Sequence, residues 1–424
     1  MDENLTHLLL QAILYASLNI GLRIFLRQPL ICAGVAFWTG WIFLISGGLI
    51  AINENWLNIG THFASYLSVM FDGALAGFLL ATPLAAARKP HYRYQFLVGI
   101  SKRFFDKFGK KVLVALLVVG TIFLLQRVAT IGFSIDYLTT ARIAYNERSS
   151  GSLLLQIGSH LSVITTMFII LRGVYDSYYG VDVRIVGLII LCGAPLGLAN
   201  AGRTFLMSYL LAYLASLLLS RAHFSSLRFV LTLREFKAVG AMFLTLITIF
   251  AIMGYLRGGY GDKLDIFYTI LIWPVSTLGA MDSWVISATS SERTYGINTF
   301  GWVVDFLARV GLIDISDVSR VLGNTLYYFE RTHDSAAVVP RSILPDLIFD
   351  FGPDAIFPSM MILALSLEIL VSRFAGYGIF LHVLAVQCLF ASFMTIQNSV
   401  VAPGFAVTIF WSAVFSQFVK YRRG

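Results

Sequence analysis

Long runs of apolar residues, separated by short polar segments, recur along the whole chain. A helix that crosses a bilayer needs roughly 20 mostly apolar residues, because its backbone polar groups must be satisfied inside the segment. The pattern predicts eleven spans, at residues 5–22, 30–52, 63–87, 112–131, 153–171, 185–198, 205–219, 238–256, 355–371, 377–396 and 404–419. The expected fold class is therefore all-α, a polytopic transmembrane helical bundle.

Composition supports this interpretation. Of 424 residues, 58% are hydrophobic and 13% are charged, and the mean hydropathy is +0.78. A soluble domain does not bury that much apolar surface in a core. The chain opens with Met-Asp-Glu-Asn and lacks the basic segment of a cleavable signal peptide, so we expect the first span to be retained.

The charges of alternate loops predict the orientation, because lysine and arginine near span ends stay on the cytoplasmic side. One set of loops holds 20 of the 31 basic residues and five acidic ones, a net charge of +15, with its largest basic loop between residues 87 and 112. This set includes Arg23, Arg172, Asp176 and Glu368. The remainder has 11 basic and 18 acidic residues, or −7. The N-terminus is predicted outside and the C-terminus inside, and the overall +8 does not indicate nucleic-acid binding.

Residues 1–424 are expected to form one membrane domain, with residues 257–354 inserted on the external side. Connections of this length are usually functional. The segment contains two apolar stretches, 267–286 and 299–312, broken by proline and by aspartates. They suit interfacial or re-entrant helices above a cavity. If both stretches instead cross the membrane, thirteen spans result.

The basic residues on the external side are nearly all arginine. Guanidinium binds phosphate or carboxylate through two parallel hydrogen bonds and stays charged, so this selection suggests an anionic ligand. The alternative is that these arginines reach lipid headgroups or pair with external acidic residues. The eleven residues are Arg127, Arg142, Arg148, Arg203, Arg257, Lys263, Arg293, Arg309, Arg320, Arg331 and Arg341.

Three positions sharpen this picture. Arg203 lies in a tight external hairpin, and Arg257 opens the insertion. Asp72 lies well inside the third span, where a charge needs a partner or water; Arg127 is a candidate partner, and a polar cavity is the alternative. The three cysteines all fall within spans, and no nucleotide-binding or zinc motif is present, so no cofactor or metal is expected.

Four short segments together resemble the Wzy-type oligosaccharide repeat-unit polymerases, which build bacterial O-antigen. The resemblance covers residues 202–370, and in the family a threonine usually precedes the Asp-Phe-Gly segment, where this chain has Pro340-Arg341-Ser342. The four segments are Gly202-Arg203-Thr204, residues 268–274 with the sequence YTILIWP, residues 298–302 with NTFGW, and residues 348–352 with IFDFG.

The resemblance implies a glycosyltransferase at the periplasmic face of the bacterial inner membrane. Such polymerases move a growing glycan from undecaprenyl pyrophosphate onto a hydroxyl of the next lipid-linked repeat unit, without nucleotide or metal. Catalysis then requires stabilisation of charge on the departing pyrophosphate and a base for the acceptor hydroxyl. A chain-length regulator is the partner that the resemblance implies.

The hypothesis assigns these roles to external residues. Arg203, Arg257 and Arg341 would hold pyrophosphate, with Arg142 and Arg293 as further candidates. Either His333 or Asp334, in the external cluster Arg331-Thr332-His333-Asp334, would act as the base. Tyr260, Trp273 and Trp302 would stack on sugar rings, or would belong to the ordinary aromatic belt of an interface.

Two other functions fit the same pattern. An O-antigen ligase uses the same lipid-linked donor with a lipopolysaccharide core as acceptor. A polysaccharide transporter or lipid-linked sugar flippase would not be an enzyme, and such proteins usually show repeated halves and charges spread through the spans. Here the charge inside the predicted spans is nearly confined to Asp72, which favours the polymerase over the transporter.

Overall fold

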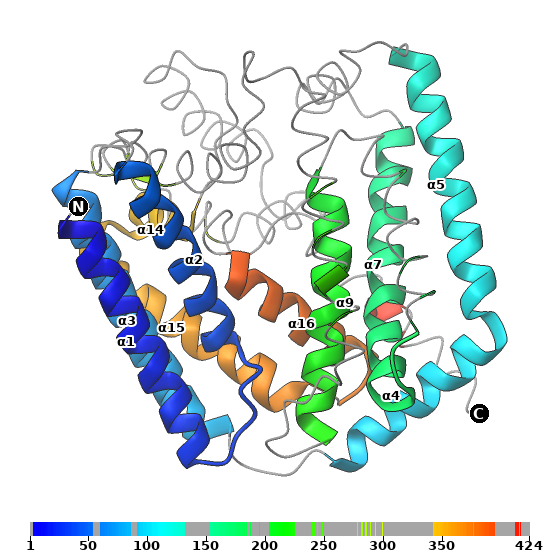
Figure 1. Cartoon of the computed structure of the whole chain (residues 1–424), viewed down its shortest axis with the longest axis horizontal. Coiled ribbons are helices and arrows are strands. Elements are labelled where there is room, and N and C mark those ends of the chain that lie inside the picture. The colour runs from blue at the N-terminus through cyan, green and yellow to red at the C-terminus, as the bar shows by residue number, and fades with distance from the viewer. Residues whose placement is uncertain are drawn as a thin grey trace. The chain divides into compact units, whose positions relative to one another are not determined.

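The computed structural model is helical throughout the part of the chain that it describes (Figure 1). That part comprises residues 3–53, 60–85, 91–131, 153–182, 203–224, 342–375 and 377–394, with scattered single positions between them and near the C-terminus. At some of these positions, Arg203 among them, only the backbone is described. No strand occurs within these ranges, so the expected all-α class is confirmed for them.

Five of the described helices are long and apolar enough to cross a membrane. They are Glu3–Phe25, Ala33–Ile50, His62–Ala85, Leu97–Gln126 and Pro353–Phe374. Each overlaps a span expected from the sequence, and the shorter apolar helices Tyr209–Ala222 and Ile379–Phe393 overlap two more. These helices indicate a membrane protein, whereas the total of eleven spans and the orientation stay predictions.

The chain divides into two compact units. Unit 1 comprises Met1–Lys89, Ile270–Ala375 and Gln387–Ala406. Unit 2 comprises Pro90–Thr269, Gly376–Val386 and Val407–Gly424. Both units therefore combine segments that are distant in the sequence.

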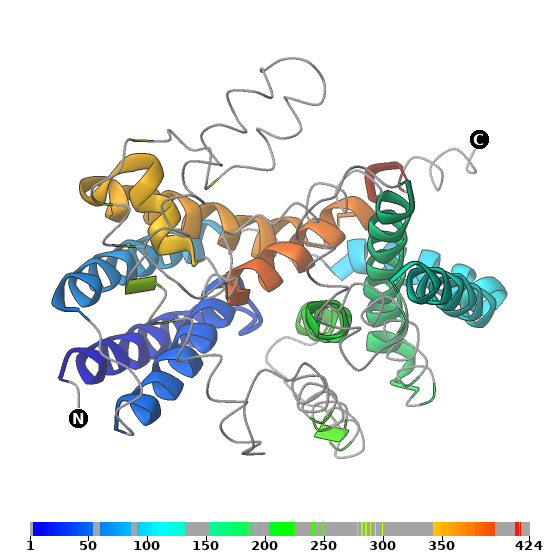
Figure 2. The ribbon, with the colours of Figure 1, turned by 90° about the horizontal axis from the view of Figure 1, so that it is seen from above.

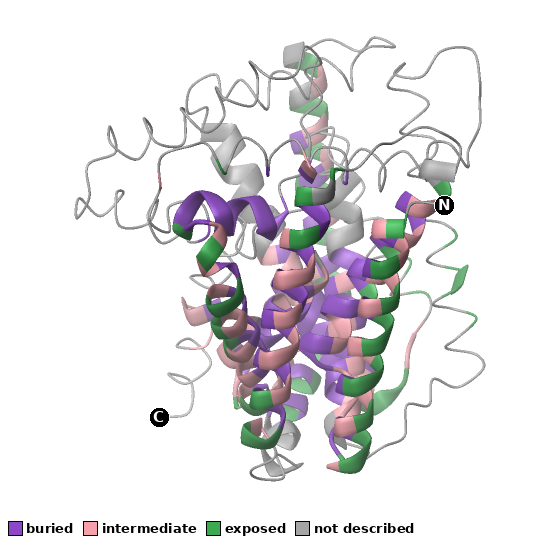
Figure 3. Cartoon of the chain, turned by 90° about the vertical axis from the view of Figure 1, so that its left-hand side faces the viewer, coloured by how far each residue is buried: buried purple, intermediate pink, exposed green. Residues whose placement is uncertain are grey.

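Unit 1 is a group of long helices in which α3 packs along α15 and α1 packs against both α2 and α3 (Figures 1 and 2). In Figure 3 the helix that begins at the N-terminus, α1, has exposed residues along one side and buried residues along the other. The elements are α1 (Glu3–Phe25), α2 (Ala33–Asn53), α3 (Thr61–Ala85), α14 (Ile343–Phe351), the 3-10 turn η2 (Pro353–Ala355), α15 (Ile356–Ile369), the π-helical turn η3 (Leu370–Phe374) and the last residues of α16 (Ile379–Met394).

Two glycines one turn apart let α3 approach α15 closely. A Cβ atom on Gly73 would lie 2.5 Å from the backbone oxygen of Phe357, and one on Gly77 would clash with the backbone oxygen of Met361. Small residues four apart are a common device for packing membrane helices, because they bring the two backbones together. This contact joins the N-terminal helices to a helix nearly 300 positions later in the chain.

Aromatic side chains fill the space between α2 and α3. Trp38 meets Phe71 edge to face, with ring centroids 5.4 Å apart, and Trp41 meets the same ring at 5.4 Å. Phe37 and Phe78 complete the cluster at 5.6 Å. All five side chains are buried, and edge-to-face pairs add to the stabilisation that burial gives.

Unit 2 is built around the pairing of α7 with α9. Gly173 of α7 lies directly against the backbone of Tyr213 and the side chain of Ser216 in α9. The elements are α4 (His91–Phe104), the π-helical turn η1 (Phe105–Gly109), α5 (Lys110–Ile131), α7 (Leu153–Tyr179), α9 (Arg203–Phe224) and the first residues of α16 (Ile379–Met394).

In unit 2, two helical regions are longer than the sequence analysis predicted. The basic loop expected between residues 87 and 112 is helical from His91 onward, because α4, η1 and α5 follow one another without a break. The basic and aromatic residues of this segment are too polar to predict a membrane span, although they are compatible with a helix. Helix α7 continues to Tyr179, eight residues beyond the predicted span, since a helix can extend past the apolar run that crosses the membrane.

Candidate functional site

The short helix α14 lies directly before α15 and is buried along almost its whole length. Ser342 begins it as N-cap, with its side chain accepting a hydrogen bond from the N–H of Leu344 at 3.2 Å. Pro345 stands in the first turn, and Gly352 follows the last residue. Serine, early proline and terminal glycine are the usual signals of a helix with defined ends. The sequence analysis assigned no helix here.

Helix α14 also joins two of the segments that carry the family resemblance. The carboxylate of Asp350, in the 348–352 segment, accepts a hydrogen bond at 2.5 Å from the backbone N–H of Thr299, in the 298–302 segment. Both residues are buried. A buried carboxylate that receives a backbone N–H fixes the position of that backbone. Asp350 therefore places the 298–302 segment against the end of α14.

Arg293 lies at the same end of α14. Its Nη1 donates to the backbone oxygen of Ile348 at 3.0 Å, and its guanidinium packs against the α-carbon of Gly352. Gly352 has φ +89°, and a Cβ atom on it would lie 2.9 Å from the guanidinium carbon, so only glycine fits both the backbone and the contact. We call Arg293, Thr299, Asp350 and Gly352 the α14 cluster.

The chemistry available to the α14 cluster is anion binding. The Arg293 side chain is half-buried, and within the described part of the chain no carboxylate forms an ion pair with it. The hydrogen bond to Ile348 uses one of the five N–H donors of a guanidinium, which leaves a face able to bind a phosphate. The alternative is a purely structural role, in which the positive charge of Arg293 stabilises the C-terminus of α14.

Of the ten residues to which the sequence analysis assigned a role, Arg293 is the one whose side chain is described. Arg203 is the first residue of α9, consistent with its expected place at the start of a span, and its side chain is not described. The other eight lie outside the described residues: Arg142, Arg257, Tyr260, Trp273, Trp302, His333, Asp334 and Arg341. Their roles stay predictions.

A second contact, within unit 1, joins the region before Arg293 to the start of α3. The carboxylate of Asp282 accepts a hydrogen bond at 3.2 Å from the N–H of Gly60, just before α3 begins. Partial burial raises the pKa of Asp282, while the Gly60 N–H and the nearby His62 act in the opposite direction. Asp282 thus holds a described position of the predicted insertion at the N-terminus of α3.

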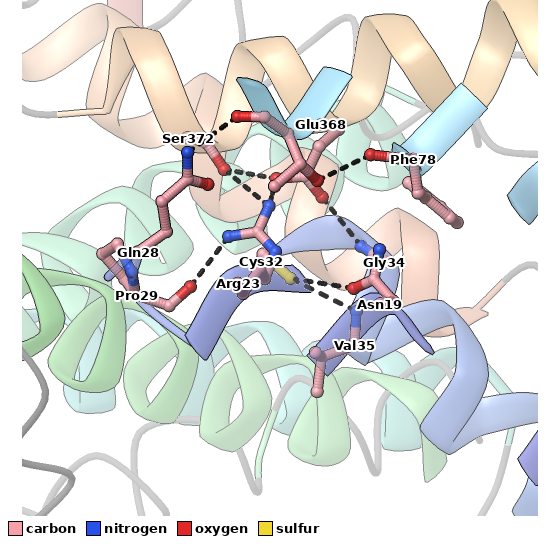
Figure 4. Close-up of polar contacts among 11 residues, drawn as sticks. Asn19, Arg23, Gln28, Pro29, Cys32, Gly34, Val35, Phe78, Glu368 and Ser372 are labelled. Carbon is pink, nitrogen blue, oxygen red and sulfur yellow. Dashed lines mark hydrogen bonds and ion pairs between the residues drawn. The ribbon is translucent and has the colours of Figure 1, made fainter. Parts of the chain in front are cut away.

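Unit 1 also contains a buried ion pair that the sequence analysis missed (Figure 4). Arg23 of α1 pairs with Glu368 of α15, and both side chains are fully buried. Glu368 also receives the N–H of Gly34 at 3.0 Å, in the first turn of α2, and the hydroxyl of Ser372. Arg23 donates to the backbone oxygen of Pro29 at 2.7 Å. We call these residues the Arg23–Glu368 cluster.

The sequence analysis counted Arg23 and Glu368 among the charges of the cytoplasmic loops. The assignment to loops was wrong, because both residues lie in helices with buried side chains, whereas the side of the membrane stays a prediction. Glu368 lies inside the predicted span 355–371, and Arg23 lies one residue beyond the predicted span 5–22. An acidic residue within an apolar run, with an arginine at the end of another run, was the available signal, because a charge at membrane depth requires a partner. The cluster links α1, α2, α15 and η3, and its two charged side chains are fully buried.

Asp72 has neutral partners in the structure. Its carboxylate accepts hydrogen bonds from the hydroxyl of Tyr15 at 2.5 Å and from the side-chain amide of Gln11 at 3.1 Å, both in α1. The candidate partner Arg127 has no described side chain. Two neutral donors offset part of the cost of a carboxylate inside an apolar helix, so this contact joins α1 to α3.

Unit 2 has buried polar groups of its own. Asp176 pairs with Arg172 at 2.6 Å, four residues earlier in α7, and accepts the hydroxyl of Tyr213 at 2.7 Å. Asp176 is fully buried, so its placement among the loop charges was also wrong. Elsewhere in the unit, the hydroxyl of Ser216 donates to the backbone of Ile170 and lies 3.0 Å from Nε2 of His382. These groups pair with one another, which is typical of structural contacts between helices.

No group of His, Cys, Asp and Glu side chains in the described part of the chain has the arrangement of a metal site. Comparisons of the chain with protein-family models, with curated proteins and with solved structures return no match.

Proposed function

We propose that this protein is a glycan polymerase of the inner membrane of a bacterium. It transfers a growing polysaccharide from undecaprenyl pyrophosphate to a hydroxyl of the next lipid-linked repeat unit, on the periplasmic side. The eleven-span topology, with the N-terminus outside and residues 257–354 as a periplasmic insertion, belongs to this proposal. The substrate is amphiphilic, which fits a chain with at least five helices able to cross a membrane.

The observation that carries the proposal is the α14 cluster. Two segments that resemble the polymerases, 298–302 and 348–352, meet through the hydrogen bond from Thr299 to Asp350. Arg293, named from the sequence as a candidate pyrophosphate ligand, lies at the same place. These two segments are 46 or more residues apart in the chain. The guanidinium of Arg293 lies at the end of the buried helix where they meet, and no described carboxylate pairs with it.

Arg293 and Asp350 have different roles in this proposal. Arg293 binds the pyrophosphate and stabilises the charge that develops on it as the sugar leaves. Asp350 is a positioning residue, because its carboxylate is buried and occupied by the Thr299 N–H. The base for the acceptor hydroxyl remains assigned to His333 or Asp334, with Arg203, Arg257, Arg341 and Arg142 as further anion ligands.

The test compares Arg293→Lys, Arg293→Ala and, as a matched control, Arg184→Ala. Arg184 is exposed in the structure and belongs to the predicted cytoplasmic side. Lysine keeps a cation that can donate to the Ile348 oxygen, but it cannot bind pyrophosphate through a planar fork. Both Arg293 variants should therefore slow polymerisation of purified lipid-linked repeat units by about 10²–10³-fold, the usual effect of removing one transition-state donor, while Arg184→Ala retains activity.

Other results would change the assignment. Full activity of Arg293→Lys with loss in Arg293→Ala would make Arg293 a cap of α14 and no more. In cells, loss of a polymerase gives single-repeat surface glycan, whereas loss of a ligase removes all attached glycan. Arg203→Ala and Arg203→Lys extend the test to Arg203. Normal polymer from these two variants and from both Arg293 variants, at normal protein levels, would remove both arginines from the mechanism.

A further inference from the structure

A strongly basic stretch lies where α4 joins α5. Between residues 97 and 126 the chain has five basic residues and a single acidic one, Asp106. All five basic residues fall within ten positions: Lys102, Arg103, Lys107, Lys110 and Lys111. Each of these side chains is exposed. A charge this one-sided over so short a distance attracts anions.

The local backbone explains why these side chains gather on the outside of the helix. The turn η1 (Phe105–Gly109) is π-helical, and it buries Phe105 and Gly109 while leaving Lys107 exposed. Wide turns of this kind bend a helix and occur often at functional positions, and Figure 1 shows α4 meeting α5 at an angle. If α5 crosses the membrane, α4 leaves it at this bend.

The acidic groups nearby do not neutralise the basic ones. Asp106 accepts a hydrogen bond from the hydroxyl of Tyr175 at 3.2 Å, and within the described residues none of the five cations forms an ion pair. Lys102 lies over the ring of Tyr179, 5.3 Å from its centroid. Lys107 lies over the ring of Phe108, also 5.3 Å from its centroid. A contact with a neutral ring does not cancel a charge, and all five cations are exposed along the outer side of α4, η1 and the start of α5.

An apolar face continues directly from these cations. Lys111, Val114, Val118, Ile122 and Leu125 recur at intervals of three and four residues, so they lie along one side of α5. The four apolar members are exposed, with Ile122 at 56% and Leu125 at 62%. The opposite side of α5 is buried through Leu113, Leu116 and Phe123. The exposed side thus has cations at one end and about three turns of apolar surface beyond them.

We infer that this face, from Lys107 to Leu125, binds an anionic phospholipid, with the phosphate diester at Lys107, Lys110 and Lys111 and an acyl chain along Val114, Val118 and Ile122. A phospholipid has both an anionic headgroup for the lysines and an acyl chain for the exposed apolar side of α5, which we call the apolar stripe. An acidic protein would neutralise the lysines but would leave the apolar stripe uncovered. Basic clusters at a membrane boundary bind anionic headgroups in this way.

The test uses the full-length protein purified in a neutral detergent. Native mass spectrometry measures its affinity for phosphatidylglycerol and for phosphatidylethanolamine with the same acyl chains. We expect tighter binding of phosphatidylglycerol. Since each nearby cation changes binding roughly fivefold, the variant Lys107→Gln/Lys110→Gln/Lys111→Gln should weaken phosphatidylglycerol binding by roughly 100-fold.

Three matched variants separate charge, shape and folding. The triple change of the same lysines to arginine should retain binding, and Lys237→Gln, which removes an exposed lysine elsewhere in unit 2, should leave it unchanged. Val114→Ala/Val118→Ala/Ile122→Ala should weaken binding of both lipids. Melting temperatures close to that of the wild type confirm that the glutamine variant is folded.

The inference is overturned by any of three results. Equal affinity of the wild-type protein for the two lipids would remove the role of headgroup charge. Unchanged affinity in the folded glutamine variant would place the lipid elsewhere. Full competition by inorganic phosphate, or by an acidic peptide at equal charge, would make the site one for free anions or for a protein, without a role for the apolar stripe.

Discussion

Within the described residues each unit contains a buried ion pair, but the two pairs connect the chain differently. In unit 1, Arg23 and Glu368 are 345 positions apart, and Glu368 also accepts the N–H of Gly34. In unit 2, Arg172 and Asp176 are one turn apart in the same helix. The first pair therefore joins α1, α2 and α15, whereas the second joins α7 mainly to itself.

The surroundings of the two arginines differ as well. Arg172 stacks on the ring of Tyr175, 4.5 Å from its centroid, and lies 5.3 Å from that of Phe105. Arg23 is fully buried and donates hydrogen bonds to Glu368, to Ser372 and to a backbone oxygen, with the Cys32 side chain also beside it. A guanidinium over aromatic rings keeps a favourable contact when its carboxylate is removed. Unit 1 should therefore depend more on its ion pair than unit 2.

The largest expected effect is that of Glu368→Gln. The amide keeps the shape of the side chain but leaves the buried Arg23 charge without compensation, which typically costs about 3–5 kcal/mol. It also weakens the acceptor of the Gly34 N–H at the first turn of α2, where a negative charge is favoured. The free energy of unfolding in detergent measures the loss.

A double variant tests whether the loss comes from the unpaired charge. Arg23→Met/Glu368→Met removes both charges and fills most of the volume, so it should be more stable than Glu368→Gln alone. A double variant as unstable as the sum of Arg23→Met and Glu368→Met would show that the two residues contribute independently, contrary to the role given to the pair.

Asp176→Asn makes the matching change in unit 2. We expect a smaller loss, about 1.5–3 kcal/mol, the contribution of a hydrogen bond to a charged group, because Arg172 keeps its aromatic contacts and Tyr213 can still donate to the amide oxygen. The same unfolding measurement, made on both acid-to-amide variants, decides the comparison. A loss in Asp176→Asn equal to that in Glu368→Gln would contradict the importance given to the long-range connection.

Hydropathy predicted the helices well because each long apolar run requires helix in a bilayer. Seven described apolar helices overlap predicted spans, and α7 starts at the predicted residue, Leu153. The connections between runs were predicted less well. Counting charges by loop assigned Arg23, Glu368 and Asp176 to loops, although all three are buried in helices. A charge within or beside an apolar run signals that a partner is needed, but it does not say which residue becomes that partner after the helices pack.

The candidate site was predicted only in part for a similar reason. Arg293 was named from its residue type and side of the membrane, but its contact with Ile348 depends on α14, a nine-residue helix too short to give a span signal. The contact of Thr299 with Asp350 joins segments 51 residues apart. Short motifs indicated that both segments matter, whereas their meeting is a property of tertiary packing.

The smallest expected effect concerns the other long-range connection of unit 1, the close packing of α3 on α15. In Gly77→Ala the added methyl meets the backbone of Met361 and Leu365. Overpacking of this kind costs about 1–3 kcal/mol, and the better helix propensity of alanine offsets about 1 kcal/mol, so a net loss of about 1 kcal/mol is expected.

Gly99→Ala in α4 is the control, since no atom lies within 4 Å of the position that the added methyl group would occupy, and it should be neutral or stabilising. Equal stability of the two variants would mean that α3 and α15 do not approach as closely as Gly73 and Gly77 allow.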